Sequence, residues 1–352
     1  MRDMLRSART ILVRAPNWVG DIVMATPFFE CLRENFPGAR IVACIRRYAA
    51  GILADAPWFD GVIACRDKDW GGFRETVRAI HRQKADAAVI LPNSWRAVLG
   101  PWLAGVRRIY GYRRGGRGIL LSGGPAPVRD ETGAVVPRPM VEYYLDLARW
   151  LGMKVPEHPR PRLYVSPEVE AEGARRLASW GIRPGDRVVG LNPGAKFGSS
   201  KCWPAEHFAA LAERLQREFS CKILLLAGPG EEELAAAVLR QSRARIIDTG
   251  AGRIDLSQLK PLIKRCELLV TNDTGPRHYA VAFGVPVVVV MGPTDPRYTS
   301  ANLEGTVVVR RDLPCAPCHL KTCPTDHACM RGITPEMVLE AARRLLAARK
   351  SA

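Results

Sequence analysis

The sequence predicts an α/β protein built from two halves, each with a parallel sheet whose strands alternate with helices. Short apolar runs alternate with amphipathic segments, and Gly, Pro, Asn and Asp mark the turns between them. A proline-rich stretch at residues 156–167 separates two such series and is typical of a linker. The length of 352 residues exceeds that of one typical compact domain and suits two.

The first half alternates between strand and helix patterns. The expected strands are 10–14, 40–45, 61–64, 87–91 and 107–112. The expected helices are 22–34, 72–83, 97–103 and 140–151, and Pro27 falls early in the first of them, where proline is tolerated. Residues 113–136 are rich in Gly, Pro and Arg and predict a long surface loop. These elements define a first domain at residues 1–160.

The second half repeats the alternation. The expected strands are 187–192, 222–227, 246–248, 268–270 and 285–291. The expected helices are 167–180, 204–217, 231–241, 256–266 and 279–283. Thr334, Pro335 and Glu336 combine a cap with an early proline, which predicts the start of an amphipathic helix through residues 337–348. We therefore expect a second domain at residues 161–333 and a terminal helix within 334–352.

The net charge of +17 comes mostly from arginines spread along the chain, without a basic tail. It indicates either an anionic partner or a general enrichment in arginine across the genome. The sequence lacks RNA-binding and zinc-finger signatures, so a nucleic-acid partner is not expected.

The location expected from the sequence is cytoplasmic. Residues 1–10 are basic, but only three apolar residues follow before Arg14, which is not the pattern of a signal peptide. No run of about 18 apolar residues occurs, so no transmembrane helix is expected. In this compartment the ten cysteines should be mostly reduced thiols.

The stretch from Val270 to Ala280 (VTNDTGPRHYA) predicts a turn between a buried strand and a helix, followed by another strand. Such turns lie at the carboxyl ends of parallel strands, where open α/β sheets bind ligands. The helix start suits phosphate, Asp273 supplies a carboxylate for sugar hydroxyls, and His278 supplies a donor. An ordinary capped helix is the alternative.

A similar turn joins the first strand to its helix at Ala15–Asp21 (APNWVGD). It lacks the G-x-G-x-x-G fingerprint of dinucleotide-binding proteins. Asp21 lies where the strand leads into the helix, so it is either a helix cap or a carboxylate presented to a ligand.

Three segments together resemble a known family. They are Ala15–Asp21; Pro193-Gly194-Ala195 with Lys201-Cys202-Trp203-Pro204; and Thr271–Gly275 with His278. The chain is similar, over nearly its whole length, to the ADP-heptose:lipopolysaccharide heptosyltransferases of glycosyltransferase family 9. Residues Leu91–Ser94 and the Cys-rich tail before Ile333–Glu336 are most similar to the heptosyltransferase II group.

The resemblance implies a GT-B fold, in which two Rossmann-like domains face each other across a cleft. The first domain would bind the acceptor, the second would bind ADP-heptose, and the last helix would pack back on the first domain. The implied reaction is inverting and needs no metal or other cofactor. The implied partners are ADP-heptose and an anionic Kdo/heptose–lipid A acceptor, for a monomer in peripheral contact with the cytoplasmic face of the inner membrane.

The resemblance also implies roles for individual residues. Asp21 matches the general base and Lys201 matches the lysine that binds the diphosphate. The remaining expected donor-binding residues are Ser199, Ser200, Asp273, Thr274, Gly275, His278 and one glutamate of 231–233, for which we choose Glu232. The expected acceptor-binding residues are Asn17, Asn93 and Arg96.

Two other functions fit the same sequence. A sugar-nucleotide epimerase of the GT-B type would use the donor alone, without a second substrate. A non-catalytic protein that binds anions or nucleic acid would keep its activity when Asp21 is replaced.

Four cysteines cluster near the end of the chain, as Cys315-x2-Cys318-x4-Cys323-x5-Cys329, with His319 and His327 among them. The spacing permits a structural zinc site, although the usual second C-x2-C pair is absent. Disulfides formed on oxidation and free thiols are the other interpretations.

Overall fold

The computed structural model describes residues 5–66, 69–250 and 253–350. The chain divides into two compact units. One contains the chain up to Tyr164 together with Arg297–Ala301, and the other contains Val165–Pro296 and the chain from Asn302. The division after Tyr164 lies close to the boundary expected at residues 160 and 161.

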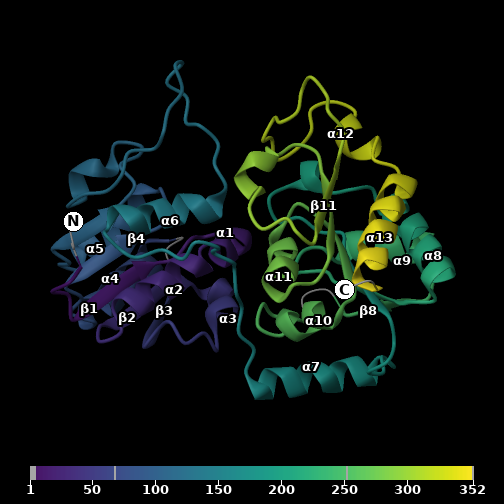
Figure 1. Cartoon of the computed structure of the whole chain (residues 1–352), viewed down its shortest axis with the longest axis horizontal. Helices are drawn as coiled ribbons and strands as arrows, with labels where there is room; N and C mark the ends of the chain where they lie inside the picture. The colour runs from purple at the N-terminus through teal and green to yellow at the C-terminus, as the bar shows by residue number, and fades with distance from the viewer. Residues whose placement is uncertain (1–4, 67–68, 251–252, 351–352) are drawn as a thin grey trace. The chain divides into compact units, whose positions relative to one another are not determined.

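The first unit is built on five parallel strands in the order β3-β2-β1-β4-β5 (Figure 1). Their bounds are β1 Thr10–Arg14, β2 Arg40–Arg46, β3 Gly61–Cys65, β4 Ala87–Ile90 and β5 Arg108–Gly111. In the register, Leu12 of β1 lies opposite both Val42 of β2 and Ala88 of β4. The strands are apolar because helices cover both faces of a parallel sheet.

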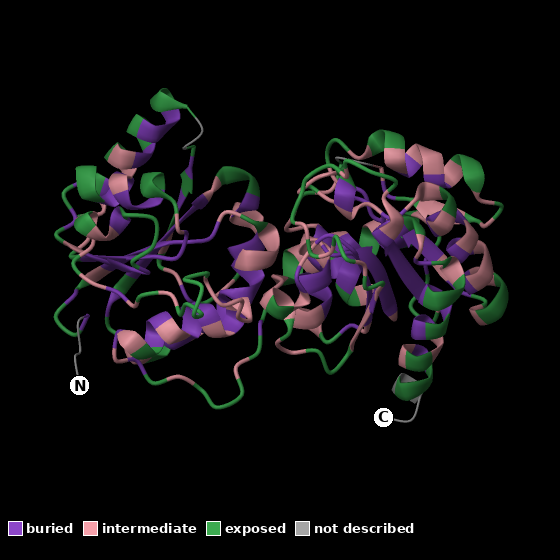
Figure 2. Ribbon diagram, turned by 90° about the horizontal axis from the view of Figure 1, so that it is seen from above, coloured by how far each residue is buried: buried purple, intermediate pink, exposed green. Residues whose placement is uncertain are grey.

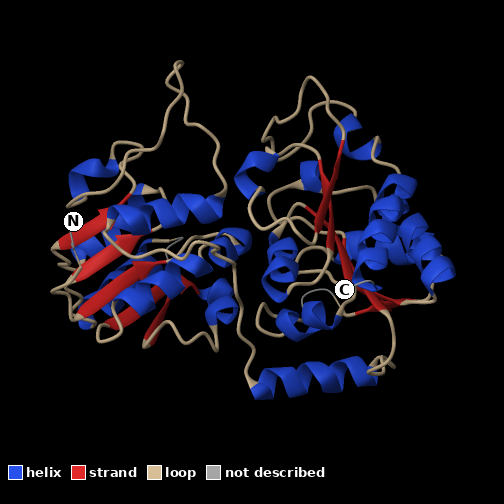
Figure 3. Cartoon of the chain, in the orientation of Figure 1, coloured by secondary structure: helices blue, strands red, loops and turns tan. Residues whose placement is uncertain are grey.

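Six α-helices accompany this sheet among the residues described. They are α1 Val19–Met24, α2 Thr26–Asn35, α3 Ala50–Leu53, α4 Trp70–Arg82, α5 Trp95–Leu103 and α6 Met140–Trp150. Helices α2 and α6 contact each other, as do α4 and α5, and the two pairs lie on opposite faces of the strands (Figure 3). The single helix expected at 22–34 is broken at Ala25, because Pro27 belongs to the first turn of a new helix.

The second unit has six parallel strands in the order β11-β10-β9-β6-β7-β8. Their bounds are β6 Val188–Asn192, β7 Lys222–Leu225, β8 Ile246–Asp248, β9 Leu268–Asn272, β10 Val287–Met291 and β11 Thr306–Arg310. The sequence interpretation did not include β11, although its three consecutive valines are typical of a strand. The middle strands β6, β9 and β10 are buried throughout (Figure 2).

Seven described α-helices belong to the second unit. They are α7 Pro167–Ser179, α8 Ala205–Phe219, α9 Glu232–Gln241, α10 Leu259–Arg265, α11 Gly275–Phe283, α12 Ala328–Arg331 and α13 Pro335–Lys350. One face of the sheet forms a core with α8, α9 and α13, while α10 contacts α7 and α11.

The terminal helix α13 belongs to the second unit and packs against its sheet. Its apolar residues Val338, Leu339 and Leu346 are buried in the core of the second unit, together with side chains of α8 and of strands β9 and β10. The apolar periodicity identifies the buried side of a helix, but it does not identify the surface that covers it.

Each sheet contains a point where the chain reverses direction across it. In the first unit, β2 and β3 extend to one side of β1, whereas β4 and β5 extend to the other. In the second unit, β7 and β8 extend to one side of β6, and β9, β10 and β11 to the other. Ligands bind outside the carboxyl ends of strands at such switch points. Residues that bind ligands are therefore expected after β1 and β4 in the first unit, and after β6 and β9 in the second.

Candidate functional site

A buried carboxylate forms the centre of the switch point in the second unit. Asp273 follows β9, and its Oδ2 accepts hydrogen bonds from Lys201 Nζ at 2.8 Å and from Thr294 Oγ1 at 2.7 Å. Its Oδ1 accepts from Arg277 Nη1 at 2.9 Å. Lys201 Nζ also donates to the Asp273 carbonyl oxygen at 2.8 Å. The sequence motifs after β6 and β9 thus meet at one point.

The two cations control the ionisation of this carboxylate. Burial alone would raise the pKa of Asp273, but Lys201 and Arg277 together lower it well below its usual value. Burial and the neighbouring guanidinium of Arg277 lower the pKa of His278 to about 3, so its ring is neutral at neutral pH. The group formed by Lys201, Asp273 and Arg277 therefore carries one net positive charge.

The backbone around Lys201 is tied to the end of β9. The Asn272 side chain accepts from the Trp203 backbone N–H at 3.1 Å and donates to the Pro193 carbonyl at 2.6 Å. The Trp203 ring is fully buried, and its Nε1 donates to the Ile333 carbonyl at 2.7 Å. These bonds fix the segment between β6 and α8, which carries Lys201.

The Cys-rich loop, residues 312–329, supports the residue next to Lys201. Ser200 donates its backbone N–H to Lys321 O at 3.0 Å and its hydroxyl to Leu320 O at 2.5 Å. His327 Nε2 lies 2.6 Å from Ser200 O. Ser200 was expected to bind the donor, but its hydroxyl is used in this packing. Ser199 beside it is exposed.

The glutamate brought nearest to the end of β6 is Glu231, not Glu232. Glu231 Oε2 accepts from the Gly228 N–H at 2.7 Å, and its carboxylate fills the space where a Cβ on Gly194 would lie. Burial raises the pKa of Glu231. Glu232 is exposed and accepts from the N–H of Gly230 in its own turn at 3.1 Å. Glu231 comes inward because α9 begins one residue later.

Helix α11 begins at the site, as its motif predicts. Thr274 is the N-cap residue, without a side-chain capping bond, and Gly275 is the first helical residue. Both are half-buried. Pro276 has no backbone N–H, and the Arg277 N–H donates to the Thr274 carbonyl at 3.2 Å, so the Gly275 N–H is the candidate donor to an anion.

In the first unit, Asp21 lies at the switch point beside β1. The N-cap of α1 is Trp18, without a side-chain capping bond, and Asp21 is the third helical residue. Asp21 therefore does not occupy the N-cap position of α1. The Asp21 side chain is half-buried. Burial raises the pKa of Tyr144, and the negative charge of Asp21 is the second largest cause of that rise.

The expected acceptor residues lie after β1 and β4, held by arginines. Asn17 Oδ1 accepts from Arg14 Nη2 and from Arg46 Nε, each at 3.0 Å. Asn93 Oδ1 accepts from the buried Arg117 at 3.2 Å and from Tyr143 OH at 3.0 Å.

Arg96 differs from these two asparagines. It is exposed on α5, and its guanidinium lies 5.8 Å and 5.7 Å from the ring centroids of Trp70 and Phe73. Arg96 thus lies beside two aromatic rings.

The cysteines of the Cys-rich loop are free thiols. Burial, and after it the charges of Cys323, Cys315 and Cys318, raise the pKa of the Cys329 thiol. No group of three or more His, Cys, Asp or Glu residues suited to a metal ion occurs in the described part of the chain. The zinc site that the spacing permits is therefore unsupported, and of the three interpretations free thiols describe the structure.

Among the helices that the structure describes, none has the length and apolar character that a membrane span requires.

Residues 73–329 match the model of glycosyltransferase family 9 (heptosyltransferase). Lipooligosaccharide heptosyltransferase 2 of Haemophilus influenzae is 30% identical over 96% of this chain and 99% of its own length. The structure of ADP-heptose lps heptosyltransferase II of Escherichia coli superposes with a TM-score of 0.80 and 29% identity, over 97% of this chain and 99% of that one.

A more distant likeness concerns the alternative of an epimerase. UDP-GlcNAc 2-epimerase from Methanocaldococcus jannaschii has a TM-score of 0.53 and 11% identity, over 96% of this chain and 92% of that one, which shows a common fold alone. The structure of the Escherichia coli heptosyltransferase II matches nearly the whole of this chain with its two α/β sheets, so the predicted GT-B fold is confirmed. The chain belongs to glycosyltransferase family 9, the heptosyltransferase family, and is a glycosyltransferase.

Proposed function

We propose that this chain transfers heptose from ADP-heptose to the heptose/Kdo inner core of lipopolysaccharide, with inversion at the anomeric carbon. The near full-length likeness to heptosyltransferase 2 supports this. The observation that carries the proposal is the group of Lys201, Asp273 and Arg277 at the switch point of the second sheet. An ammonium has three N–H donors, of which two are used by Asp273, so one remains for a diphosphate oxygen.

The reaction is a single displacement. The acceptor hydroxyl oxygen attacks the anomeric carbon while the bond from that carbon to the diphosphate oxygen breaks. Asp21 acts as the general base that takes the hydroxyl proton. ADP leaves with the electron pair, and Lys201 offsets the negative charge that develops on it. This sequence of steps requires no metal ion or other cofactor.

Asp273 has two roles in this proposal. Its oxygens hold Lys201, Arg277 and Thr294 in place, which uses three of about four acceptor positions of a carboxylate. The remaining position is assigned to a heptose hydroxyl. Thr274 and Gly275 are assigned to phosphate, and Glu231 to the adenosine ribose.

The acceptor is an anionic glycolipid. Asn17 and Asn93 are assigned to the acceptor, and each holds an arginine, Arg46 or Arg117, that adds positive charge beside it. We further propose that the enzyme works as a monomer on the cytoplasmic side of the inner membrane.

The proposal is tested by incubating the purified chain with ADP-heptose, with and without a truncated Kdo/heptose acceptor. We expect ADP release only with the acceptor, whose mass should rise by one heptose. A change in the donor sugar without acceptor would instead establish an epimerase, and no turnover under either condition would favour a non-catalytic anion-binding protein.

A further inference from the structure

Helix α5 exposes apolar side chains on the side that faces away from the sheet. Its inner residues Ala97, Val98 and Pro101 are buried. On the outer side, Trp95, Trp102 and Leu103 are 46%, 50% and 50% exposed, and Leu99 between them is half-buried. Positions 95, 99, 102 and 103 form one stripe of a helix. A surface helix of a soluble domain normally carries polar residues there, so this stripe requires an explanation.

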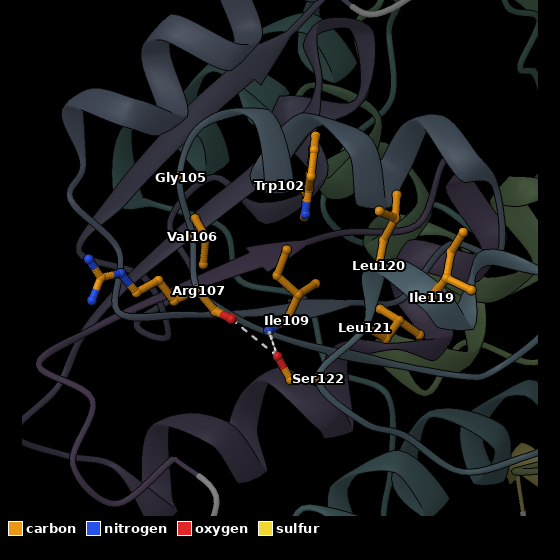
Figure 4. A pocket seen from close by; sticks show the side chains of 9 residues that line it. All are labelled: Trp102, Gly105, Val106, Arg107, Ile109, Ile119, Leu120, Leu121 and Ser122. Atoms are coloured by element: carbon orange, nitrogen blue, oxygen red, sulfur yellow. Dashed lines mark hydrogen bonds between the residues drawn. The ribbon is translucent and has the colours of Figure 1, made fainter.

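The neighbouring 3-10 helix η2, Arg117–Leu120, extends the apolar surface. Ile119 is 82% exposed, and it lines a pocket of about 410 Å³ together with Trp102, Val106, Ile109, Leu120 and Leu121 (Figure 4). The Ser122 hydroxyl accepts from the Ile109 N–H at 3.0 Å and donates to Arg107 O at 3.2 Å, which fixes the segment after η2 against β5. We call Trp95, Leu99, Trp102, Leu103 and Ile119 the α5–η2 surface.

The chain around this surface has an unusual charge distribution. Residues 87–129 contain no Asp, Glu or Lys, but they contain seven arginines: 96, 107, 108, 113, 114, 117 and 129. Arg107, Arg113 and Arg114 are exposed, while Arg117 is buried. The apolar side chains thus belong to a stretch of the chain that carries positive charge. No carboxylate in the same stretch balances that charge.

We propose that the α5–η2 surface binds an anionic lipid bilayer at its headgroup boundary. Tryptophan is enriched at this boundary because its ring is apolar and its N–H is polar. Leu103 and Ile119 would enter the apolar side of the boundary, and the exposed arginines would contact lipid phosphates. The charge decides against a purely apolar protein partner, since the core of a protein interface is depleted in charged residues.

This proposal does not depend on the sugar-transfer reaction. It rests on exposure and charge in the first unit, and lipid binding is measured without donor or acceptor. Its failure would therefore leave the proposed sugar transfer untouched, and the reverse is also true.

The test is sedimentation of the full chain with vesicles of phosphatidylcholine, alone or mixed with phosphatidylglycerol. We expect binding to the mixed vesicles only, and weaker binding as salt rises. The triple variant Trp102→Ser/Leu103→Ser/Ile119→Ser should lower the partition coefficient between vesicles and water about tenfold or more, because three apolar side chains are no longer transferred from water into the bilayer. Arg107→Gln/Arg113→Gln should lower it about tenfold or more as well.

The matched control is Val62→Ser/Leu303→Ser/Met337→Ser, which removes three exposed apolar side chains elsewhere. It should bind as the wild type does, and urea midpoints of all variants should show that each is folded. Equal binding by the triple variant and the control would overturn the proposal, as would wild-type protein that binds neither vesicle. A wild-type dimer that the triple variant converts to a monomer would also overturn it and assign the surface to a second copy of the chain.

Discussion

Replacing Asp21 with asparagine is expected to lower kcat by about 10²- to 10⁴-fold, the usual contribution of a general base. Asparagine has nearly the same shape but cannot accept the proton of the attacking hydroxyl. The KM for ADP-heptose should change little, because Asp21 belongs to the first unit and the assigned donor residues belong to the second. Steady-state kinetics with a truncated acceptor measures both constants.

A matched variant separates this role from a structural one. Asp69→Asn removes a carboxylate from the N-cap of α4 in the same unit, and asparagine caps helices as well as aspartate does. Its kcat should equal that of the wild type. The urea midpoint of Asp21→Asn should also be unchanged. If the kcat of Asp21→Asn falls less than about threefold, Asp21 is not the general base, because a general base usually contributes about 10²- to 10⁴-fold.

Replacing Asp273 with alanine is expected to lower the free energy of unfolding by about 3–5 kcal/mol, because it removes the carboxylate that pairs with two buried cations. The Lys201 and Arg277 side chains are 13% and 2% exposed. Urea unfolding of the wild type and the variant measures the difference. Glu172→Ala is the matched control, since Glu172 also holds two cations, Arg175 and Arg176, but on an exposed helix. Its cost should stay below about 1 kcal/mol.

The same pair of proteins tests the lowered pKa of Asp273. Because its folded-state pKa lies below the unfolded value of about 3.9, its ionised form contributes its full stability above that pH. That contribution is lost only as the pH falls toward the folded-state pKa. The difference between wild type and variant should therefore be constant from about pH 5 to pH 8. A difference that falls within this window would contradict the assignment of Asp273 as the ionised partner.

Most of the fold follows from local patterns in the sequence. Apolar runs such as Val285–Met291, which lies between two glycines, predict buried parallel strands, and all but one of the described strands were found in this way. The valines of β11 follow an irregular segment and were missed. The surface against which α13 packs depends on how whole helices and strands pack together. A short stretch of sequence does not carry that information.

The site was predicted in part for the same reason. Lys201 and Asp273 belong to separate motifs, and the structure brings them within 2.8 Å. The sequence interpretation assigned no role to Arg277, whereas the structure uses it as the second cation on Asp273. Thr294 lies 21 residues from Asp273, and His327 lies 127 residues from Ser200, so neither contact has a local signal. The choice between Glu231 and Glu232 depended on the exact start of α9, which local patterns do not fix.

The central claim, that Lys201 at the switch point of the second sheet holds the diphosphate of the donor, is tested most directly by titrating ADP into the purified chain in a calorimeter. We expect Lys201→Met to weaken ADP binding by about 10- to 100-fold, which is the loss of one hydrogen bond between charged groups. Lys264→Met, which removes the same charge from an exposed ion pair with Glu170, should bind as the wild type does. Equal affinity of Lys201→Met and wild type for ADP would contradict the claim.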